Sequence, residues 1–470
     1  MCWGYRKNYL TLCGVVFMSG RLSFNDAPLI RVEPPGPRAS ELMAKQDRWE
    51  TGSRTYTRFF RTAFDEGRGS TIRDVDGNIF VDWFSGICVL NLGHAHPAVM
   101  EALRAQLGRL VHINEVATEA RVGFLEDLVS TLPGSLKGRA KVMFTVTGAD
   151  ACEAAMSLAR WTTKRRTIVS FSGAYHGVHG AVVGATANHH YREYAGVPQY
   201  AVYHLPYPYT YRFPFRVAEG DEAKVVVEML EHLLRDDYSG PGPIGGVMVE
   251  PIQGEGGYIV PPDDFLPMLR EVTDRYSVPL IVDEVQSGVG RTGRVWASEH
   301  SGVSPDIMCV GKSIGGGIPF SLIAYREELD EGLPAGFHLG TYRGNPLGLA
   351  AGRAVLRVLR GEGFLERVRS KGEEVKKRFQ ELQSAVPQIG EVRGKGFMIG
   401  VELVDDPVKK TPSALTGKLR EEMFRRGVLM HTCGHFGNVM RFMAPLTIED
   451  DLITAGLRVF ESSLKKLVLQ

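Results

Sequence analysis

The stretch PLIVDEVQSGVGRTG, residues 279–293, decides which kind of α/β protein this chain is. An apolar run typical of a buried strand ends at Asp283, and a literal G-x-G-x-x-G follows it at positions 288, 290 and 293. A dinucleotide fingerprint instead puts its first glycine at the strand end and an acid at the end of the next strand. Here the next apolar run, DIMCV, leads to Lys312. We therefore treat nicotinamide or flavin oxidoreduction as a distant alternative.

Apolar runs alternate with helical patterns through the middle of the chain, which predicts a largely parallel sheet. Ligands of open α/β sheets bind at the carboxyl ends of the strands, so residues there are expected to share one pocket. Five runs end next to unusual polar residues: KVMFTVTG at Thr147 and Gly148, TIVSFSGAYHG at Tyr175 and His176, GGVMVE at Glu250, VPLIVD at Asp283, and DIMCVG at Lys312.

An acid at one strand end and a lysine at the next suit one cofactor, pyridoxal 5′-phosphate. A lysine amine can attack the cofactor aldehyde, and a buried carboxylate can hold a proton on the ring nitrogen. The stretch TGAD, with Thr147, Gly148 and Ala149, offers the free N–H groups of a helix N-terminus to the phosphate. Each piece is common by itself, but their joint order predicts this cofactor.

From residue 345 onward the pattern changes to long helices and short strands, which predicts a second, smaller α+β unit. We expect residues 1–17 to be disordered or a non-native start, with Met18 as the alternative start. Residues 18–80 are expected to contribute to the small domain, 81–344 to form the large cofactor-binding domain, and 345–470 to form the C-terminal small domain.

The bulk composition is that of an ordinary soluble enzyme, with 44% hydrophobic and 23% charged residues. A formal net charge of +1 gives no general attraction to nucleic acid or to an anionic membrane. The six cysteines include no C-x-x-C pair, so we expect free thiols and a cytoplasmic location.

Taken in order, these motifs resemble the class III, fold-type I pyridoxal-phosphate aminotransferases, the family of 4-aminobutyrate, ornithine and acetylornithine aminotransferases. The resemblance runs from about residue 35 to the C-terminus. It implies a large domain with a mostly parallel sheet plus a smaller α+β domain. The motifs that carry it are DVDGNIFVDWFSGICVLNLGHAHPAV, TGADACEAA, GAYHG, EPIQGEGG, VDEVQSGVGRTG, GKSIGGGIP, GTYRGNPLGLAA and MRFMAPLTI.

The resemblance implies a role for each matching residue. Lys312 would form the Schiff base and move the substrate proton, and Asp283 would pair with the ring nitrogen. Arg441 would bind a substrate carboxylate, and Glu255 would pair with Arg441 when a donor with a distal amine is bound. The remaining expected contacts are Thr147, Gly148 and Ala149 to the phosphate, Tyr175, His176, Val285 and Gln286 to the ring, and Ile87 to the substrate. Gly340 and Thr341 would reach the phosphate of a partner subunit, which implies a homodimer or a dimer of dimers.

Two departures from the family pattern bear on the substrate. Thr147 and Asp150 replace the usual Ser and Glu, which is a conservative change. Val178 stands where 4-aminobutyrate and acetylornithine enzymes carry an arginine, so 4-aminobutyrate and 2-oxoglutarate lose an expected anchor. We therefore predict transfer from a neutral, basic or omega-amino acid to a keto acid. An amino-acid racemase or epimerase of the same family is the alternative, which Glu255 disfavours because some such racemases carry Asp there.

We predict no metal site. The stretch HTCGH contains ligand-type side chains at His431, Cys433 and His435, but no further ligands are apparent around it. Glu250 is expected to be structural, and His94 and His96 in GHAHP to be turn and packing residues.

Overall fold

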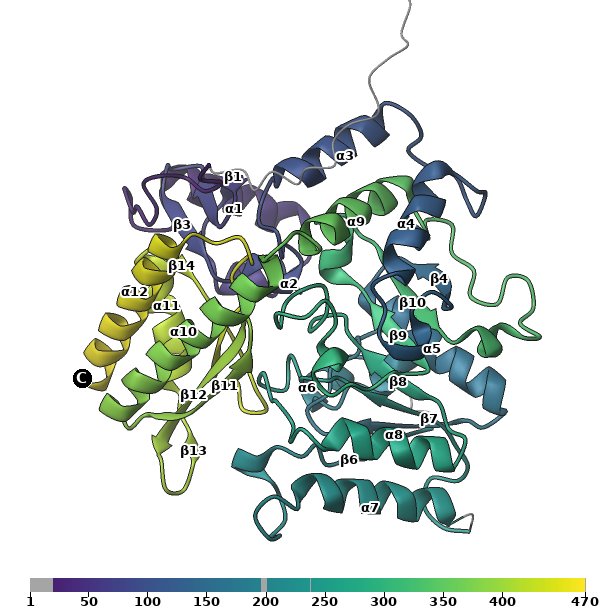
Figure 1. The fold of residues 1–470 in the computed structure, drawn as a ribbon. Coiled ribbons are helices and arrows are strands. Elements are labelled where there is room, and N and C mark those ends of the chain that lie inside the picture. The colour runs from purple at the N-terminus through teal and green to yellow at the C-terminus, as the bar shows by residue number, and fades with distance from the viewer. Residues whose placement is uncertain (1–19, 196–200, 237, 470) are drawn as a thin grey trace, which may run out of the picture.

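The computed structural model describes residues 20–195, 201–236 and 238–469, and the segment expected to be disordered, 1–17, lies outside these ranges. Three β-sheets organise the described chain, with seven, five and four strands. The largest sheet and its helices lie on one side of the molecule, and the two smaller sheets lie on the other (Figure 1).

The seven-stranded sheet has the order β4-β10-β9-β8-β7-β5-β6. All its strands run the same way except β10, which is antiparallel to both of its neighbours. The central strands are buried on both faces, which explains their nearly continuous apolar sequences. The strands are β4 (Lys141–Thr145), β5 (Thr167–Phe171), β6 (Val202–Leu205), β7 (Ile244–Val249), β8 (Leu280–Asp283), β9 (Ile307–Val310) and β10 (Ser321–Tyr325).

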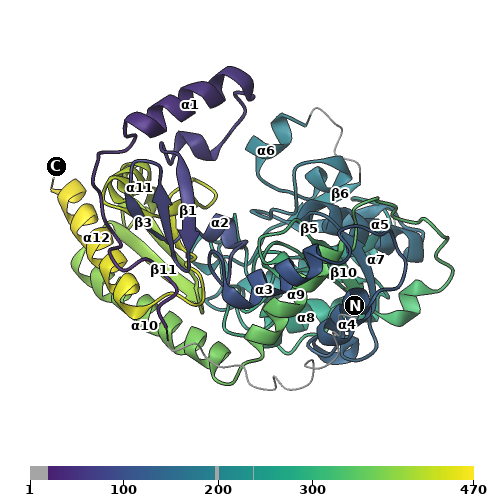
Figure 2. The ribbon, with the colours of Figure 1, turned by 90° about the horizontal axis from the view of Figure 1, so that it is seen from above.

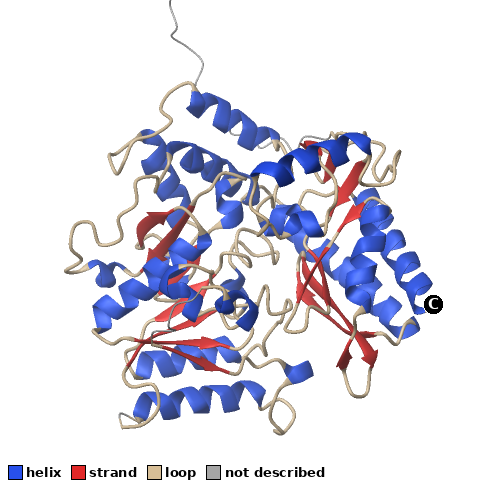
Figure 3. Ribbon diagram, turned by 180° about the vertical axis from the view of Figure 1, so that it is seen from behind, coloured by secondary structure: helices blue, strands red, loops and turns tan. Residues whose placement is uncertain are grey.

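Helices cover both faces of this sheet, with strands between them (Figure 3). On one face lies α5 (Gly148–Thr163), whose alanine-rich stripe packs against β7 to β10. On the other face, α7 (Glu222–Arg235) and α8 (Phe265–Arg275) pack against β5 to β8. Further along the sheet, α3 (Pro97–Leu107), α4 (Glu119–Val129) and α9 (Pro346–Leu359) pack together and cover β9 and β10.

The two smaller sheets combine segments from both ends of the chain. One has the order β11-β12-β16-β15, with β13 paired to β12, and the other has the order β1-β2-β3-β14. Helices α10 (Phe364–Ala385), α11 (Leu415–Arg425) and α12 (Asp450–Val468) flank these sheets at the left of Figure 1. The strands are β1 (Phe64–Arg68), β2 (Thr71–Asp74), β3 (Ile79–Asp82), β11 (Ile389–Lys395), β12 (Met398–Asp406), β13 (Thr411–Pro412), β14 (Val428–Leu429), β15 (His431–Cys433) and β16 (Val439–Phe442).

Three short or peripheral helices complete the described fold. Helix α1 (Pro37–Trp49) lies at the outer edge of the molecule, and of its residues only Ala39 is buried (Figure 2). Helix α6 (His189–Glu193) follows the loop after β5, and α2 (Ser85–Cys88) follows β3. The α2 turn is left-handed: Ile87 has a φ of 58°, and its three companions also have positive φ. No helix among the described residues is long and apolar enough to cross a membrane.

Candidate active site

A cavity of about 940 Å³ opens where the carboxyl ends of the large sheet face the smaller sheets. Twelve of the fourteen residues predicted for the site line it: Ile87, Thr147, Gly148, Ala149, Tyr175, His176, Glu255, Asp283, Val285, Gln286, Lys312 and Arg441. The other two, Gly340 and Thr341, lie outside this cavity and are exposed on the surface of the chain. The residues predicted from strand ends, from Thr147 to Lys312, therefore line one pocket, together with Ile87, Glu255 and Arg441, which the family resemblance indicated.

The parallel pairing of β8 with β9 sets Asp283 and Lys312 at the same edge of the sheet. Asp283 is the last residue of β8 and lies opposite Cys309 of β9, and Lys312 follows β9 after Gly311. Lys312 has a φ of 48°, in the left-handed region that side chains rarely adopt. Backbone strain of this kind is typical of functional sites, where the surrounding structure holds it in place.

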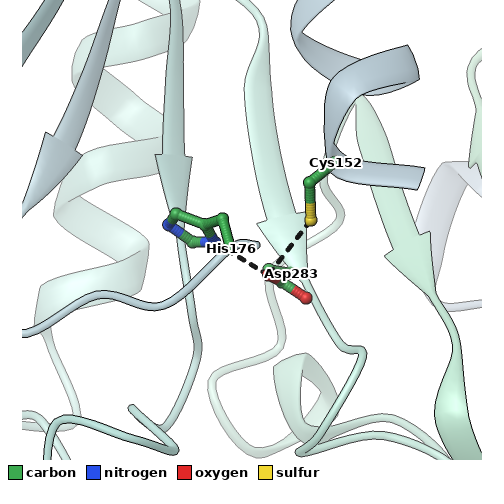
Figure 4. A group of neighbouring side chains, drawn as sticks. All are labelled: Cys152, His176 and Asp283. Carbon is green, nitrogen blue, oxygen red and sulfur yellow. Dashed lines mark hydrogen bonds and ion pairs between the residues drawn. The ribbon is translucent and has the colours of Figure 1, made fainter. Parts of the chain in front are cut away.

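Asp283 is held by three hydrogen bonds, and Figure 4 shows the two that it makes with His176 and Cys152. Its Oδ2 lies 2.7 Å from His176 Nδ1 and accepts from the Cys152 thiol at 3.3 Å, and its Oδ1 accepts from the Val285 N–H at 2.9 Å. Burial by itself would raise the pKa of Asp283, but the hydrogen bond and charge of His176 outweigh it and lower that pKa. The carboxylate is therefore ionised at neutral pH and can hold a proton on a partner nitrogen.

The N-terminus of α5 forms a tight cradle beside Asp283. Thr147 caps the helix, and its Oγ1 accepts from the Asp150 N–H at 3.2 Å while Asp150 accepts from the Val146 N–H at 2.9 Å. A Cβ atom at Gly148 would lie 2.6 Å from Val285 Cγ1, so only glycine fits there. The first N–H groups of a helix have no partner within it, and an anion is favoured at this end. This cradle suits a phosphate.

Tyr175 and Glu250 form another part of the pocket wall. The Glu250 carboxylate accepts from the N–H groups of Tyr175 at 3.1 Å and Gly254 at 2.9 Å, so it shapes two loops, as expected of a structural acid. Burial raises the pKa of Glu250 to about 7 and that of Tyr175 to about 12. The Tyr175 ring thus remains neutral at physiological pH and can lie against a planar ligand.

An ion pair crosses the pocket, from the five-stranded sheet to the loop that follows β7 of the large sheet. Arg441 of β16 is 2% exposed, and its Nη1 donates to Glu255 Oε2 at 2.9 Å. Burial would lower the pKa of Arg441, but the Glu255 charge outweighs it and raises that pKa. The Tyr191 hydroxyl donates to the other Glu255 oxygen at 3.2 Å. A guanidinium in this position can bind a carboxylate once Glu255 releases it.

The pocket wall also includes residues that sequence reasoning did not predict, among them Tyr56, Tyr191, His431 and His94, which was expected only to pack in a turn. Tyr56 and Tyr191 stand in segments without a strand-end signal, so nothing local indicated them. His431 was weighed only as a metal ligand, whereas it lines the pocket beside Arg441, at 3.4 Å between Nδ1 and Nη2. Val178 also lines the pocket, so the place of the expected arginine faces the cavity without a charge.

Metal-ligand side chains gather at one place among the described residues. Cys152, His176 and Asp283 have ligand atoms within 4.8 Å of one another, and this group does not include His431, Cys433 or His435. Because the hydrogen bonds described above already engage the Asp283 carboxylate, we read this group as a polar network. The described cysteines, Cys88, Cys152, Cys309 and Cys433, are free and buried.

The glycine motif after β8 forms turns. Residues 288–293 contain no helix, and Gly290 and Gly293 have φ of 84° and 81°. A dinucleotide fingerprint needs a helix N-terminus here, so the structure supports reading the glycine match as accidental.

Comparison with known proteins agrees with this geometry. The chain is 39% identical to the diaminobutyrate–2-oxoglutarate aminotransferase of Rhizobium meliloti (strain 1021), over 86% of this chain and 88% of that protein. It is 33% identical to the alanine/serine racemase of Pyrococcus horikoshii, over 93% of each chain. A crystal structure of an amine transaminase from an uncultivated Pseudomonas species, in its PLP-bound form, matches with a TM-score of 0.80 and 30% identity, covering 89% of this chain and 98% of that one.

A sequence profile described as Aminotransferase class-III matches residues 51–464. The matched range includes all three sheets and every predicted site residue. The chain belongs to the class III aminotransferases, enzymes that depend on pyridoxal phosphate.

Proposed function

We propose that this enzyme takes the amino group of an amino acid with a distal amine and passes it to a keto acid. The observation that carries this proposal is the Glu255–Arg441 pair, 2.9 Å long, in the same pocket as Lys312. While the pair is intact, the Arg441 charge is neutralised and a donor without a carboxylate near its reacting amine can enter. When Glu255 withdraws, Arg441 can bind the carboxylate of a keto acid.

The residues present fit the cofactor. The glycine cradle at the start of α5 accepts an anion: Thr147, Gly148 and Ala149 would hold the phosphate there. The ionised Asp283, positioned by His176, would hold a proton on the ring nitrogen. The ring itself would lie among Tyr175, Val285 and Gln286, and Lys312 would be its covalent attachment point.

When bound, pyridoxal phosphate supplies an aldehyde that takes up the amino group and a ring that withdraws electrons from the substrate. The chain supplies the proton transfers and the orientation. The Lys312 amine would take the proton from the substrate carbon that carries the reacting amine and deliver it to the cofactor carbon, as a general base and then a general acid. Asp283 would keep the ring nitrogen protonated throughout.

The substrate end of the pocket supports a distal-amine donor. Val178 leaves the place of the expected second arginine without charge, and Ile87 adds an apolar wall. A donor whose far end is a lone carboxylate, as in 4-aminobutyrate, is disfavoured there, whereas the far end of 2,4-diaminobutyrate carries an ammonium group beside its carboxylate. The relative in Rhizobium meliloti is named for diaminobutyrate and 2-oxoglutarate. We propose 2,4-diaminobutyrate as the first donor to test, with pyruvate, which has no distal carboxylate, and 2-oxoglutarate as the acceptors to compare.

We further propose that the active unit is a homodimer. The end of α3 with the loop 108–118 lies beside the loop 339–345, joined by the ring contact of His112 with Tyr342 and by the ion pair of Arg343 with Glu115. They expose a row of large apolar side chains: Leu107, Leu110, Val111, Val116, Leu339 and Tyr342. Such a patch is characteristic of a protein interface. Its burial by a second copy would bring Gly340 and Thr341 toward a partner's phosphate.

Two broader assignments are also part of this proposal. We divide the chain into an N-terminal segment (18–80), a large domain (81–344) and a small domain (345–470). The sheet β1-β2-β3-β14 supports grouping the N-terminal segment with the small domain, and the pairing of Val81 and Asp82 with β14 extends that segment slightly past residue 80. The free, buried thiols support a cytoplasmic location.

The deciding experiment incubates the holoenzyme with a panel of amino acids, with and without a keto acid, followed by chiral chromatography. The proposal expects loss of the donor amino group that depends on the keto acid, fastest for donors with a distal amine. Appearance of the D-enantiomer without any keto acid would establish racemisation instead. Strong activity on 4-aminobutyrate would show that an uncharged residue at 178 does not exclude that donor.

A further inference from the structure

His431 stands directly beside the arginine expected to bind the substrate carboxylate. Strands β15 and β16 pair antiparallel, and their register sets His431 opposite Arg441. The His431 side chain lines the pocket and is 7% exposed. Aromatic rings surround it, with centroids at 5.0 Å for Phe59, 5.7 Å for Tyr56, 6.1 Å for Phe60 and 5.7 Å for Phe84.

The imidazole of His431 offers Arg441 a lone pair. An arginine can only donate, and its Nη2 lies 3.4 Å from His431 Nδ1, so this nitrogen must accept. The Thr432 N–H also donates to Nδ1 at 2.7 Å. The Thr432 carbonyl, 2.8 Å from Nδ1, would favour a proton on this nitrogen, but two donors point at it and only one acceptor does. Burial and the Arg441 charge lower the pKa of His431 to about 3. The ring is therefore neutral, with its proton on Nε2.

Each member of the Glu255–Arg441 pair has one contact outside the pair. Tyr191 donates to the Glu255 oxygen that does not touch Arg441, and His431 meets the Arg441 nitrogen that does not touch Glu255. If the pair opens, neither side chain loses all of its contacts. Arg441 keeps a neutral acceptor, which holds the guanidinium without competing for its charge as a second carboxylate would.

We propose that His431 is a positioning residue that keeps Arg441 aimed into the pocket while Glu255 is withdrawn, and so supports binding of carboxylates next to the reacting carbon. This inference rests on the proposed role of Arg441. It predicts that His431 matters for the keto-acid half of the reaction and little for a distal-amine donor, because with that donor Glu255 still holds Arg441.

The two ring nitrogens can be tested separately. Asparagine places an acceptor oxygen near the position of Nδ1, whereas glutamine places its amide near Nε2, and leucine removes both. The Nε2–H has no partner among the described residues, so it could instead contact the substrate itself. The proposal expects His431→Asn to bind the keto acid nearly as tightly as the wild type, and His431→Gln and His431→Leu to bind it more weakly. Rescue by Gln and not by Asn would overturn the proposal in favour of a direct substrate contact.

The experiment measures both half-reactions of the holoenzyme variants by rapid mixing. For His431→Leu, the apparent dissociation constant of the keto acid should rise about three- to tenfold, the size expected for one long hydrogen bond to a charged group. The donor half-reaction should stay within about twofold. If the donor reacts too slowly to aminate the cofactor, the dissociation constant of non-reactive glutarate measures carboxylate binding directly, and His431→Leu should raise it as it raises that of the keto acid. Equal losses in both half-reactions would mean that His431 only packs the aromatic cluster.

Two controls separate this inference from the proposed function. His435→Leu makes the same change in the turn between β15 and β16, outside the pocket wall, and should alter neither half-reaction. Arg441→Lys should weaken keto-acid binding more than His431→Leu does. If Arg441→Lys has no effect, the proposed role of Arg441 fails. If it weakens binding and His431→Leu does not, only the role of His431 fails.

Discussion

Replacing Glu255 by glutamine should change the two half-reactions in opposite directions. In the structure, Glu255 neutralises the buried Arg441 through one contact of 2.9 Å. With Gln in its place, the guanidinium charge stays uncompensated and repels the ammonium group of an incoming donor. A keto acid, in contrast, no longer competes with an internal carboxylate for Arg441, so it should bind more tightly.

The size of the effect follows from the geometry. A charge-assisted hydrogen bond contributes about 1.5–3 kcal/mol. Because the Glu255 side chain is 22% exposed, we take the lower value, about 1.5 kcal/mol, which is roughly tenfold in a binding constant. The ratio of the two apparent dissociation constants should therefore change by about tenfold to hundredfold, since each half-reaction contributes up to one such factor.

Rapid mixing of the holoenzyme with donor alone, or of the aminated enzyme with keto acid alone, measures each constant through the cofactor absorbance. Tyr191→Phe is the matched control, because it removes a neutral contact with Glu255 at 3.2 Å and leaves both charges in place. A change of both half-reactions in the same direction and by the same factor would refute the reasoning.

Four further outcomes are expected. Borohydride reduction followed by peptide mass spectrometry should find the cofactor on Lys312, and an adduct at another lysine in Lys312→Ala would contradict this assignment. Asp283→Asn should keep the cofactor bound but lower turnover about a hundredfold or more, because the amide cannot hold the ring proton by its charge; unchanged turnover would argue against that role. Gly148→Ala puts a methyl 2.6 Å from Val285 Cγ1, and the strain of about 1–3 kcal/mol should weaken cofactor binding roughly tenfold to hundredfold in equilibrium dialysis. His431 has a pKa of 6.5 when unfolded and about 3 when folded, so the unfolded chain binds more protons between these values and stability falls as pH is lowered. From pH 7 to pH 5 the wild type should lose about 2 kcal/mol that His431→Leu retains, and a thermal-unfolding series in which both lose the same amount would be inconsistent with a buried neutral ring.

The polar residues at the strand ends of the large sheet could be predicted from sequence because the signal is local. Each apolar run and the polar residues after it are contiguous, and parallel strands bring all such ends to one edge. The sequence therefore predicts that Asp283 and Lys312 lie at the same edge of the sheet, and the structure has them there. The same reasoning does not specify strand order, and nothing in the sequence indicated that β10 runs antiparallel between β4 and β9.

Contacts made between distant segments were out of reach. The proximity of His431 to Arg441 depends on the register of a hairpin, and one residue of slip would turn His431 to the other face. Likewise, Cys152 meets Asp283 only because α5 lies across the large sheet, 131 positions away in sequence. Tyr56 reaches the pocket because the N-terminal strands pair with β14, a contact between opposite ends of the chain.

The left-handed α2 turn changes how this pocket can be remodelled. Widening an active site usually lowers stability, because a filled wall is exchanged for a void. At Ile87 a branched side chain is held at a φ of 58°, which costs about 1–2 kcal/mol relative to a residue that accepts this conformation. Glycine or asparagine there would relieve that strain while enlarging the cavity. Selection for bulkier amines, in the laboratory or in nature, therefore meets an unusually low stability barrier at this position.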